Sequence, residues 1–374
     1  MIVVYGLLVL SVIICIHELG HYVAARLCGV RVESFSLGMG PILLHKQGKM
    51  TDWRLSLFPI GGYCGMKGEQ DFKKACELEL RHIHADKDSM YGVRPIFRAF
   101  IGFAGPLANF LLAILCYSIV ALTGYTYYAA STKITLADEV YPELHSAARE
   151  AGLQTGDTIL SVAGSAVADF SELFSAVAIH PNEDIVVTVD RGGEIVPFTV
   201  HTDLDTSTGA GKIGVIADSE SVIEREAKRY TFFPALAHGA QETVKTLTLT
   251  IKSITLLFKG VKVTEAVSGP ARITTMLGST VKTGFSAGLR TGLAGLLEFV
   301  ALISVSLFFM NLLPIPILDG SLVLFSLIEA LFHTEISPKI KNNVQYVGLA
   351  LIVALFAIAL TSDARYFLRM FHAL

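Results

Sequence analysis

The chain has 374 residues, of which 52% are hydrophobic and only 17% are charged. Because soluble domains carry about 25% charged residues, this composition excludes an ordinary soluble protein and favours an integral membrane protein. The formal net charge of −3 gives no reason to expect a nucleic-acid partner. The five cysteines are odd in number and lack zinc-finger spacing, so no disulfide framework is expected.

The first apolar run covers residues 2–27 and is long enough to cross a bilayer, which takes about 20 residues of helix. No basic region precedes it, so it is predicted to be a retained transmembrane helix rather than a cleaved signal. The run contains His17, Glu18 and His21. Ionisable side chains at membrane depth are costly and usually serve a function.

Histidines four residues apart lie on one face of a helix, so His17 and His21 can bind the same metal ion. The adjacent Glu18 can then act as a general base on a metal-bound water. The pattern is a weak signal by itself because it also occurs on solvated helix surfaces. Inside a membrane span no solvated face exists, so the sequence predicts a metal site there.

The loop at residues 26–95 is rich in lysine and arginine and is therefore predicted to be cytoplasmic. Residues 125–290 would then face outside. The second apolar run, residues 96–124, contains Gly105 and Asn109. Small residues here are expected to pack the second span against the first. Asn109 could also donate to a catalytic oxygen or to a metal ligand, and it is retained as a candidate substrate-binding residue.

Residues 129–222 contain short β-branched runs, such as 158–162 and 184–190, separated by turn signals. This pattern predicts a compact, mostly β domain. Residues 228–262 are predicted to form an amphipathic helix with a stripe of lysines. Two alternatives remain open for this helix: it lies on the outer membrane face, or it packs on the β domain.

The third apolar run, residues 293–332, is interrupted at 311–320, and a fourth covers 344–361. Asp319 is an isolated carboxylate in the interrupted run and is the natural third metal ligand; the alternative is a helix N-cap, since a helical run follows. Two histidines and a carboxylate leave a position for water, as in catalytic zinc sites. Non-haem iron oxygenases use the same ligand set, but the adjacent Glu18 favours hydrolysis.

Three motifs together resemble the site-2 protease family of intramembrane zinc metalloproteases, in particular the bacterial branch that includes the regulator-of-sigma-E protease. They are His17-Glu18-Leu19-Gly20-His21, Gly105-Pro106-Leu107-Ala108-Asn109, and Asn311 with Leu318-Asp319-Gly320. The resemblance implies that Zn²⁺ is bound by the two histidines and the aspartate, and that Glu18 is the catalytic base. It also implies that Asn311 helps to hold the substrate backbone.

Residues 52–69 are similar to the membrane-re-entrant β-loop of that family, and Gly61 and Gly62 within them are candidate substrate-binding residues. Residues 53–58 are expected to form a strand with an exposed edge that pairs with an unwound substrate by β-addition. The alternative is a simple cytoplasmic hairpin. Residues 146–159 and 211–215 resemble parts of the PDZ domain of the same branch, and the chain has room for one such domain.

These observations predict a multi-pass α-helical membrane protein with four transmembrane helices, a membrane-associated β-loop and an inserted PDZ domain. The expected domains are an N-terminal membrane part (1–128), the PDZ domain (129–222), a surface helix and linker (223–290), and a C-terminal membrane part (291–374). The location implied by the resemblance is the bacterial inner membrane, with the PDZ domain on the extracytoplasmic side. No oligomeric state is predicted.

The resemblance implies a zinc-dependent endopeptidase that cleaves single-span membrane proteins, such as anti-sigma factors or remnant signal peptides, in regulated intramembrane proteolysis. Its expected partners are these transmembrane substrates and the lipid bilayer. The alternative function is an inactive, PDZ-bearing membrane chaperone or scaffold. A metal transporter is a more distant alternative, because it would need more intramembrane carboxylates than the sequence provides.

Overall fold

The computed structural model describes residues 2–205, 209–218, 221–257, 275, 284–286 and 288–372. The described residues fall into two compact units. The helical unit contains the chain up to Thr123, the segment Arg229–Leu247 and the C-terminal helices. The β unit contains Gly124–Lys228 and, among the described residues, also 248–257. The predicted β domain at 129–222 falls inside the β unit; the other predicted boundaries remain predictions.

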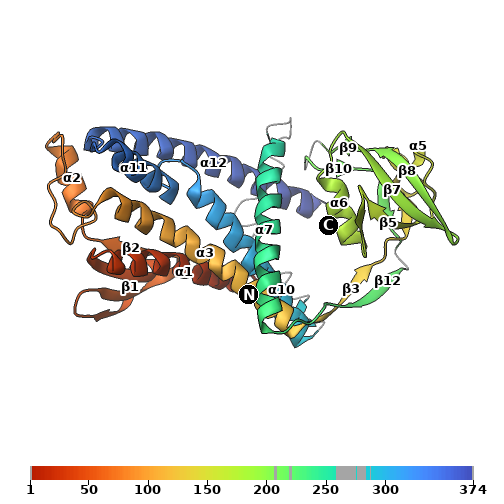
Figure 1. Cartoon of the computed structure of the whole chain (residues 1–374), viewed down its shortest axis with the longest axis horizontal. Helices are drawn as coiled ribbons and strands as arrows, with labels where there is room; N and C mark the ends of the chain where they lie inside the picture. Colours follow the sequence, from red (N-terminus) through yellow and green to blue (C-terminus); the bar gives the residue numbers. More distant parts are fainter. Residues whose placement is uncertain are drawn as a thin grey trace. The chain divides into compact units, whose positions relative to one another are not determined.

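Four helices among the described residues are long and apolar enough to cross a membrane, in agreement with the sequence. Their apolar composition leaves few polar side chains that need hydrogen-bond partners. A helix also pairs its own backbone N–H and carbonyl groups, which a membrane-spanning segment requires because lipid offers no partners. They are α1 (Ile2–Leu27), α3 (Pro95–Thr123), α10 (Leu289–Leu312) and α12 (Pro338–His372). Figure 1 shows α3 running between α1 and α12 within the helical unit.

The predicted interruption of the third apolar run is confirmed. After α10 ends at Leu312, the chain becomes extended at Leu313, and a second helix, α11 (Asp319–Phe332), begins six residues later. Pro314 and Pro316 lie in this gap, and proline removes a backbone donor and disfavours helix in the residue before it. Asp319 is therefore the first residue of a new, short helix.

Helices α1 and α3 are in close contact, as predicted from the small residues of the second span. A side chain added at Gly20 would place its Cβ 2.4 Å from the carbonyl oxygen of Ala104 and 2.8 Å from Cβ of Ala108. Real Cβ atoms do not approach so closely, so only glycine allows this helix spacing. The contact fixes the face of α1 that carries the two histidines.

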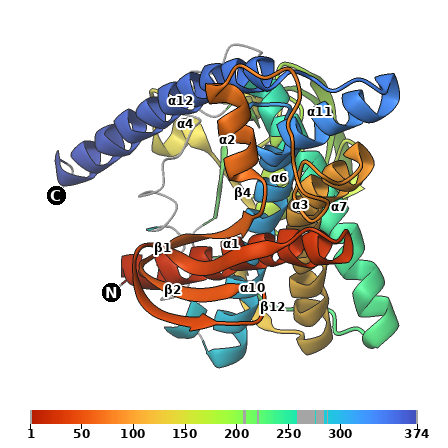
Figure 2. The same cartoon turned by 90° about the vertical axis from the view of Figure 1, so that its left-hand side faces the viewer.

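Strands β1 (Val32–Gln47) and β2 (Asp52–Met66) pair in antiparallel orientation and lie alongside α1 (Figure 2). Both strands fold back on themselves, so residues 34–37 have partners on two sides, at 62–65 and at 52–55. Residues 52–56 also pair with 42–47. The expected edge at 53–58 is therefore wrong: residues 53–55 have partners on both sides, and the two outer strands are residues 62–66 and 42–47.

Helix α2 (Glu69–Glu77) and the loop after it are attached to the connection between α11 and α12. Glu79 accepts from Lys339 Nζ at 2.9 Å, and Glu335 lies 2.9 Å from His82 Nδ1. The predicted cytoplasmic loop thus has an ordered end next to the start of the last span.

The predicted amphipathic helix is α7 (Phe232–Leu257); residues 258–262 of the prediction lie outside the described residues. In the helical unit, Thr246 and the Tyr117 hydroxyl of α3 are 3.0 Å apart. Leu247 packs beside Ala113 and Cys116 of α3. Neither of the two alternatives foresaw this contact with the second span.

The β unit is mostly β, as predicted. Its main sheet has the order β6-β5-β7-β8, and all its pairs are antiparallel. These strands are β5 (Thr158–Val162), β6 (Ser165–Ala166), β7 (Asp184–Arg191) and β8 (Glu194–His201). Three further pairs complete the unit: β3 (Thr126–Ala130) with β12 (Val222–Glu226), β4 (Ile134–Leu136) with β11 (Val215–Ala217), and β9 (Asp203–Leu204) with β10 (Gly211–Lys212).

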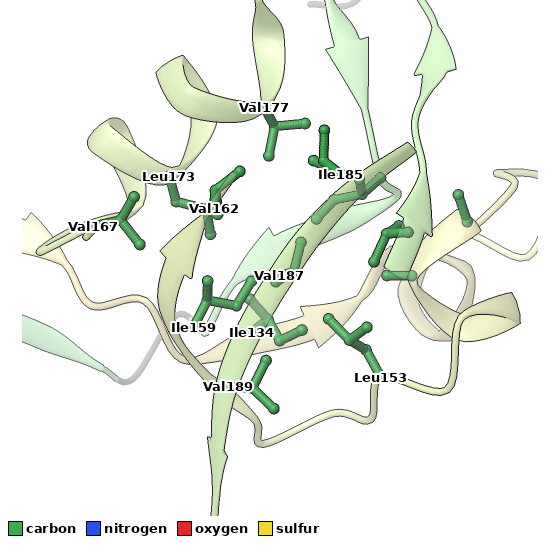
Figure 3. Packing of buried hydrophobic residues seen from close by; sticks show 14 of the residues in the cluster. Ile134, Leu153, Ile159, Val162, Val167, Leu173, Val177, Ile185, Val187 and Val189 are labelled. Carbon is green, nitrogen blue, oxygen red and sulfur yellow. The ribbon is translucent and has the colours of Figure 1, made fainter. Parts of the chain in front are cut away.

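The core of the β unit lies between this sheet and helix α6 (Phe170–Ala178). Alternate residues of β7, including Ile185 and Val187, are buried, as period-2 patterning requires. Leu173 and Val177 of α6 pack against them (Figure 3). The short helices α4 (Ala137–Val140) and α5 (Ala147–Glu150) precede the sheet.

Asp157 is a buried carboxylate at the turn before β5. Arg191 donates to its two oxygens at 2.8 and 2.7 Å, and the backbone N–H of Gln154 donates at 2.9 Å. Burial alone would raise the pKa of Asp157, but these hydrogen bonds outweigh it and hold the pKa below its ordinary value. A carboxyl whose pKa is lowered on folding stabilises the fold above its unfolded pKa of about 3.9 and loses that effect as the pH falls.

Replacing Arg191 with methionine is expected to destabilise the β unit by about 1–3 kcal/mol at neutral pH, because the buried carboxylate loses a charged partner. Amide hydrogen exchange of β5 and β7 in the full-length protein measures this as faster exchange, and the difference from wild type should shrink below about pH 4. The control is Arg149→Met, whose pairs with Asp138 and Glu139 are exposed. Equal effects of the two variants would contradict this account.

Candidate metal centre

Two histidines and one aspartate converge in the helical unit. His17 and His21, one turn apart on α1, are both buried, and their Nε2 atoms are 3.2 Å apart. Asp319 lies with Oδ2 3.0 Å from Nε2 of His17 and Oδ1 3.3 Å from Nε2 of His21. Leu318 occupies the N-cap of α11, so the alternative that Asp319 is the cap is wrong.

The spacing of these atoms fits a single zinc ion. A tetrahedral zinc with bonds of about 2.1 Å separates its ligand atoms by about 3.4 Å. The three side chains each offer one ligand atom, and these atoms all lie within 4.8 Å of one another. The distances from the aspartate oxygens to Nε2 of His17 and to Nε2 of His21 are 3.0 and 3.3 Å. Imidazole nitrogen and carboxylate oxygen are ligands that zinc prefers. The donor set therefore fits the metal and leaves a fourth position open.

Helix α3 fixes the ring of His21. Nδ1 of His21 donates to the carbonyl oxygen of Ile101 at 2.8 Å, which leaves Nε2 free to bind metal. On the same helix, a Cβ at Gly105 would lie 2.2 Å from Nε2 of His21. The absent side chain is what makes room for the ring. The two imidazoles meet edge to face at an interplanar angle of 82°.

Asn109 of α3 is fully buried and contacts His17. Its Nδ2 lies 3.2 Å from Nδ1 of His17, while its Oδ1 has no partner among the described residues. A histidine that binds metal through Nε2 carries its proton on Nδ1. Turning the amide by 180° brings Oδ1 to accept that proton. Asn109 thus contacts His17, a candidate ligand, as one alternative from the sequence expected, but as an acceptor and not as the expected donor. Its substrate-binding role remains a prediction.

Glu18 lies beside the edge strand of the β1–β2 hairpin. Cγ of Glu18 would be 3.8 Å from a Cβ at Gly62, and its carboxylate interacts with the backbone of Cys64. Glu18, His21 and Asp319 together line a cleft of about 890 Å³. The cleft brings the candidate base, two candidate ligands and an exposed strand edge to one place.

Two other predicted residues lie outside that set. Asn311 is near the end of α10, and Gly61 adopts φ +85° with Met39 against it. Neither is among the described residues that line the cleft. Gly62 does approach Glu18, as stated above. The substrate-binding roles of Asn311 and Gly61 therefore remain predictions.

Sequence reasoning missed two parts of the cleft wall. One is the segment from Phe72 to Tyr91, whose two rings stack with centroids 5.7 Å apart. The other is the start of α12, which contributes Asn342, Gln345 and Tyr346. The run of amide residues at the start of an otherwise apolar span was a signal that could have pointed to α12.

Comparison with known proteins identifies the family of the chain. A model of peptidase family M50 matches residues 5–355 of the chain. The chain belongs to peptidase family M50, the site-2 protease family. A protein of Treponema pallidum is 34% identical over 99% of both chains. One from Campylobacter jejuni is 32% identical over 95% of this chain and 91% of its own, and one from Agrobacterium fabrum 32% identical over 96% and 94%.

The names of all three relatives contain the words zinc metalloprotease. With the family match and the four apolar helices, they make this chain a zinc metalloprotease of a membrane-embedded peptidase family. The regulator-of-sigma-E branch and the PDZ domain are finer assignments, and they are taken up as proposals below.

Substituting Gly105 with alanine is expected to displace the His21 ring and lower zinc affinity by at least about 10-fold, because the new Cβ would overlap Nε2. Zinc bound per protein after dialysis against a graded metal buffer measures the change. Gly102→Ala is the matched control on the same helix, since its Cβ would meet side-chain carbons of Val323 and Leu322 at 3.1–3.3 Å and neither histidine ring. A Gly105→Ala protein that binds zinc like wild type would contradict the assignment of His21.

Proposed function

We propose that this protein is an intramembrane endopeptidase in which His17, His21 and Asp319 hold the zinc ion and Glu18 is the general base. The observation that carries the proposal is the convergence of these three ligand atoms within 4.8 Å, next to Glu18. The two histidines lie on α1, which is apolar enough to span a membrane, and Asp319 comes from the start of α11. The proposed substrates are single-span membrane proteins, such as anti-sigma factors or remnant signal peptides, in regulated intramembrane proteolysis.

The proposed chemistry is hydrolysis of a peptide bond. Zinc supplies Lewis acidity, which polarises a carbonyl and lowers the pKa of a water to about 7. Glu18 accepts the proton of the attacking water and delivers it to the leaving nitrogen, as a general acid–base in the cleft. Ile101 and Asn109 keep the two imidazoles in the orientation that the reaction needs.

A helical substrate must unwind before its backbone can react, and the edge strand at residues 62–66 offers a partner for the unwound segment. The strand pairs with β1 on one side, and no described strand pairs with its other side. Cys64, Gly65 and Met66 line the cleft that holds Glu18. We therefore place β-addition at this edge rather than at 53–58.

The other end of the hairpin supports a membrane-associated β-loop. Met39, Ile42, Leu43, Leu57 and Phe58 are all exposed large hydrophobic residues. An apolar surface of this kind is unfavourable in water and favourable in lipid. The basic residues of the same loop support a cytoplasmic location for its polar parts.

We also propose that the β unit is a PDZ domain of the regulator-of-sigma-E branch, on the extracytoplasmic side of a bacterial inner membrane. It has a groove of about 200 Å³ between α6 and residues 211–216, lined by apolar side chains including Leu173, Val177 and Ile213. Such a groove suits an extended peptide. The same groove would serve the alternative function, an inactive chaperone or scaffold.

Two variants separate the enzyme from the scaffold. Glu18→Gln is expected to retain zinc and lose cleavage of a transmembrane peptide by about 100- to 10,000-fold, because only the proton acceptor is removed. Asp319→Ala is expected to lose zinc as well, because a ligand is removed. Zinc content and peptide cleavage by the purified full-length protein measure both effects.

Cleavage and zinc content test different parts of the proposal. If Glu18→Gln cleaves the peptide as fast as wild type, the endopeptidase mechanism is wrong. If Asp319→Ala keeps a full complement of zinc, the aspartate is not the third ligand. If wild type binds the peptide but does not cleave it, the scaffold is the better description.

A further inference from the structure

The first turns of α12 contribute two side-chain amides to the cleft that Glu18, His21 and Asp319 line. Asn342, Gln345 and Tyr346 are spaced to share one helix face, and all three line the cleft with Glu18, His21 and Asp319. Asn342 is partly buried and Gln345 is exposed. Neither side-chain amide has a hydrogen-bond partner in the part of the chain that the structure describes. We call Asn342 and Gln345 the amide pair.

Two contacts hold this part of α12 in place, one on each side of the amide pair. Before it, Lys341 Nζ lies 2.6 Å from Oε1 of Glu329, whose Oε2 lies 2.9 Å from Arg98. The three residues Lys341, Glu329 and Arg98 are 6%, 3% and 5% exposed, so this is a buried ion cluster. Moving Lys341 away would leave an uncompensated buried charge on Glu329, so this contact anchors the start of α12.

After the amide pair, α12 touches the segment that leads to Asp319. A Cβ at Gly348 would lie 2.3 Å from Cβ of Pro316 and 2.5 Å from its carbonyl oxygen. The absence of a side chain at Gly348 thus allows the helix to pack directly on residues 313–318. The amide pair is held between two fixed points, next to a candidate zinc ligand.

An unwound peptide in this cleft has backbone groups to satisfy on both of its edges. In an extended peptide the N–H and carbonyl groups point alternately to the two sides. If the strand edge at 62–66 pairs with one side, the other side faces away from β2. Figures 1 and 2 show β2 and α12 on different sides of the helical unit.

Amide side chains are suited to this second side. Each offers both an N–H donor and a carbonyl acceptor, so it can pair with a backbone carbonyl or a backbone N–H without regard to substrate sequence. Each unpaired backbone N–H or carbonyl group costs up to several kcal/mol in a site without water, and less where water enters. A hydrogen-bond partner from the protein removes this cost and therefore favours the unwound state of the substrate. The contacts on either side of the pair fix the backbone of α12, so only the two side chains have to be ordered on binding.

We propose that Asn342 and Gln345 bind the backbone of the unwound substrate, on the side opposite to the strand edge at 62–66. This inference rests on the proposed endopeptidase function and specifies how its substrate is held. Asn343 provides a matched comparison: it has the same side chain, is exposed, and is not among the residues that line the cleft.

The test measures binding of a fluorescent transmembrane peptide to the full-length protein in detergent, in a Glu18→Gln background that prevents turnover. Asn342→Ala and Gln345→Ala are each expected to raise the Kd about 3- to 10-fold, the effect of losing one neutral hydrogen bond, and the double variant to raise it further. Asn343→Ala is expected to bind like its parent. Zinc content, unchanged in all variants, shows that the centre is intact.

A series of peptides N-methylated at single positions around the scissile bond tests for contact with the substrate backbone. One methylated position should weaken binding to the parent protein but add little in the double variant, because the hydrogen bond is already lost. A purely structural role for the amide pair would give additive effects at every position, and this result would overturn the proposal.

An unchanged Kd in the double variant, or an equal loss in Asn343→Ala, would also overturn it. These failures leave the endopeptidase function intact provided that Glu18→Gln abolishes cleavage in the otherwise wild-type protein. If Glu18→Gln cleaves normally, the proposed function itself fails, whatever the amide variants do.

Discussion

The close approach of α1 and α3 is the constraint on which the centre depends. Gly20 permits the helices to touch, because a Cβ added there would lie 2.4 Å from the Ala104 carbonyl oxygen. Gly105 leaves the space that the His21 ring fills. The ring then meets the Ile101 carbonyl, which fixes its orientation. A wider helix spacing would leave Nδ1 of His21 unpaired and its ring free to turn, and a metal ligand with a free ring binds weakly.

The break between α10 and α11 is the second requirement, and it is costly in a membrane. Each backbone group released from a helix needs another partner or contact with water. The break lies where residues 317–319 line the cleft. It lets α11 begin at Asp319 and bring the carboxylate to His17 and His21. Gly348 then allows α12 to cover the break at Pro316.

Sequence predicted the parts that depend on local pattern. His17 and His21 follow from helical spacing, Asp319 from being an isolated carboxylate in an apolar run, and β5 from a β-branched run that ends at a turn. It could not predict the Ile101 contact, since a backbone carbonyl carries no residue signal. Nor could it predict the folding back of β1 and β2, which depends on long-range register and not on the strand propensity of residues 53–58.

The two walls of the cleft solve different parts of one problem. Hydrolysis inside a membrane requires an extended substrate where hydrogen-bond partners are scarce, and a single strand edge can satisfy only half of that backbone. The helical unit already places the outer strand at 62–66 on one wall and the amide pair on another, on backbone that is fixed by contacts without substrate. Unwinding would therefore exchange internal helix hydrogen bonds for a set that the protein holds ready, which lowers the free-energy cost of exposing the scissile bond to Glu18.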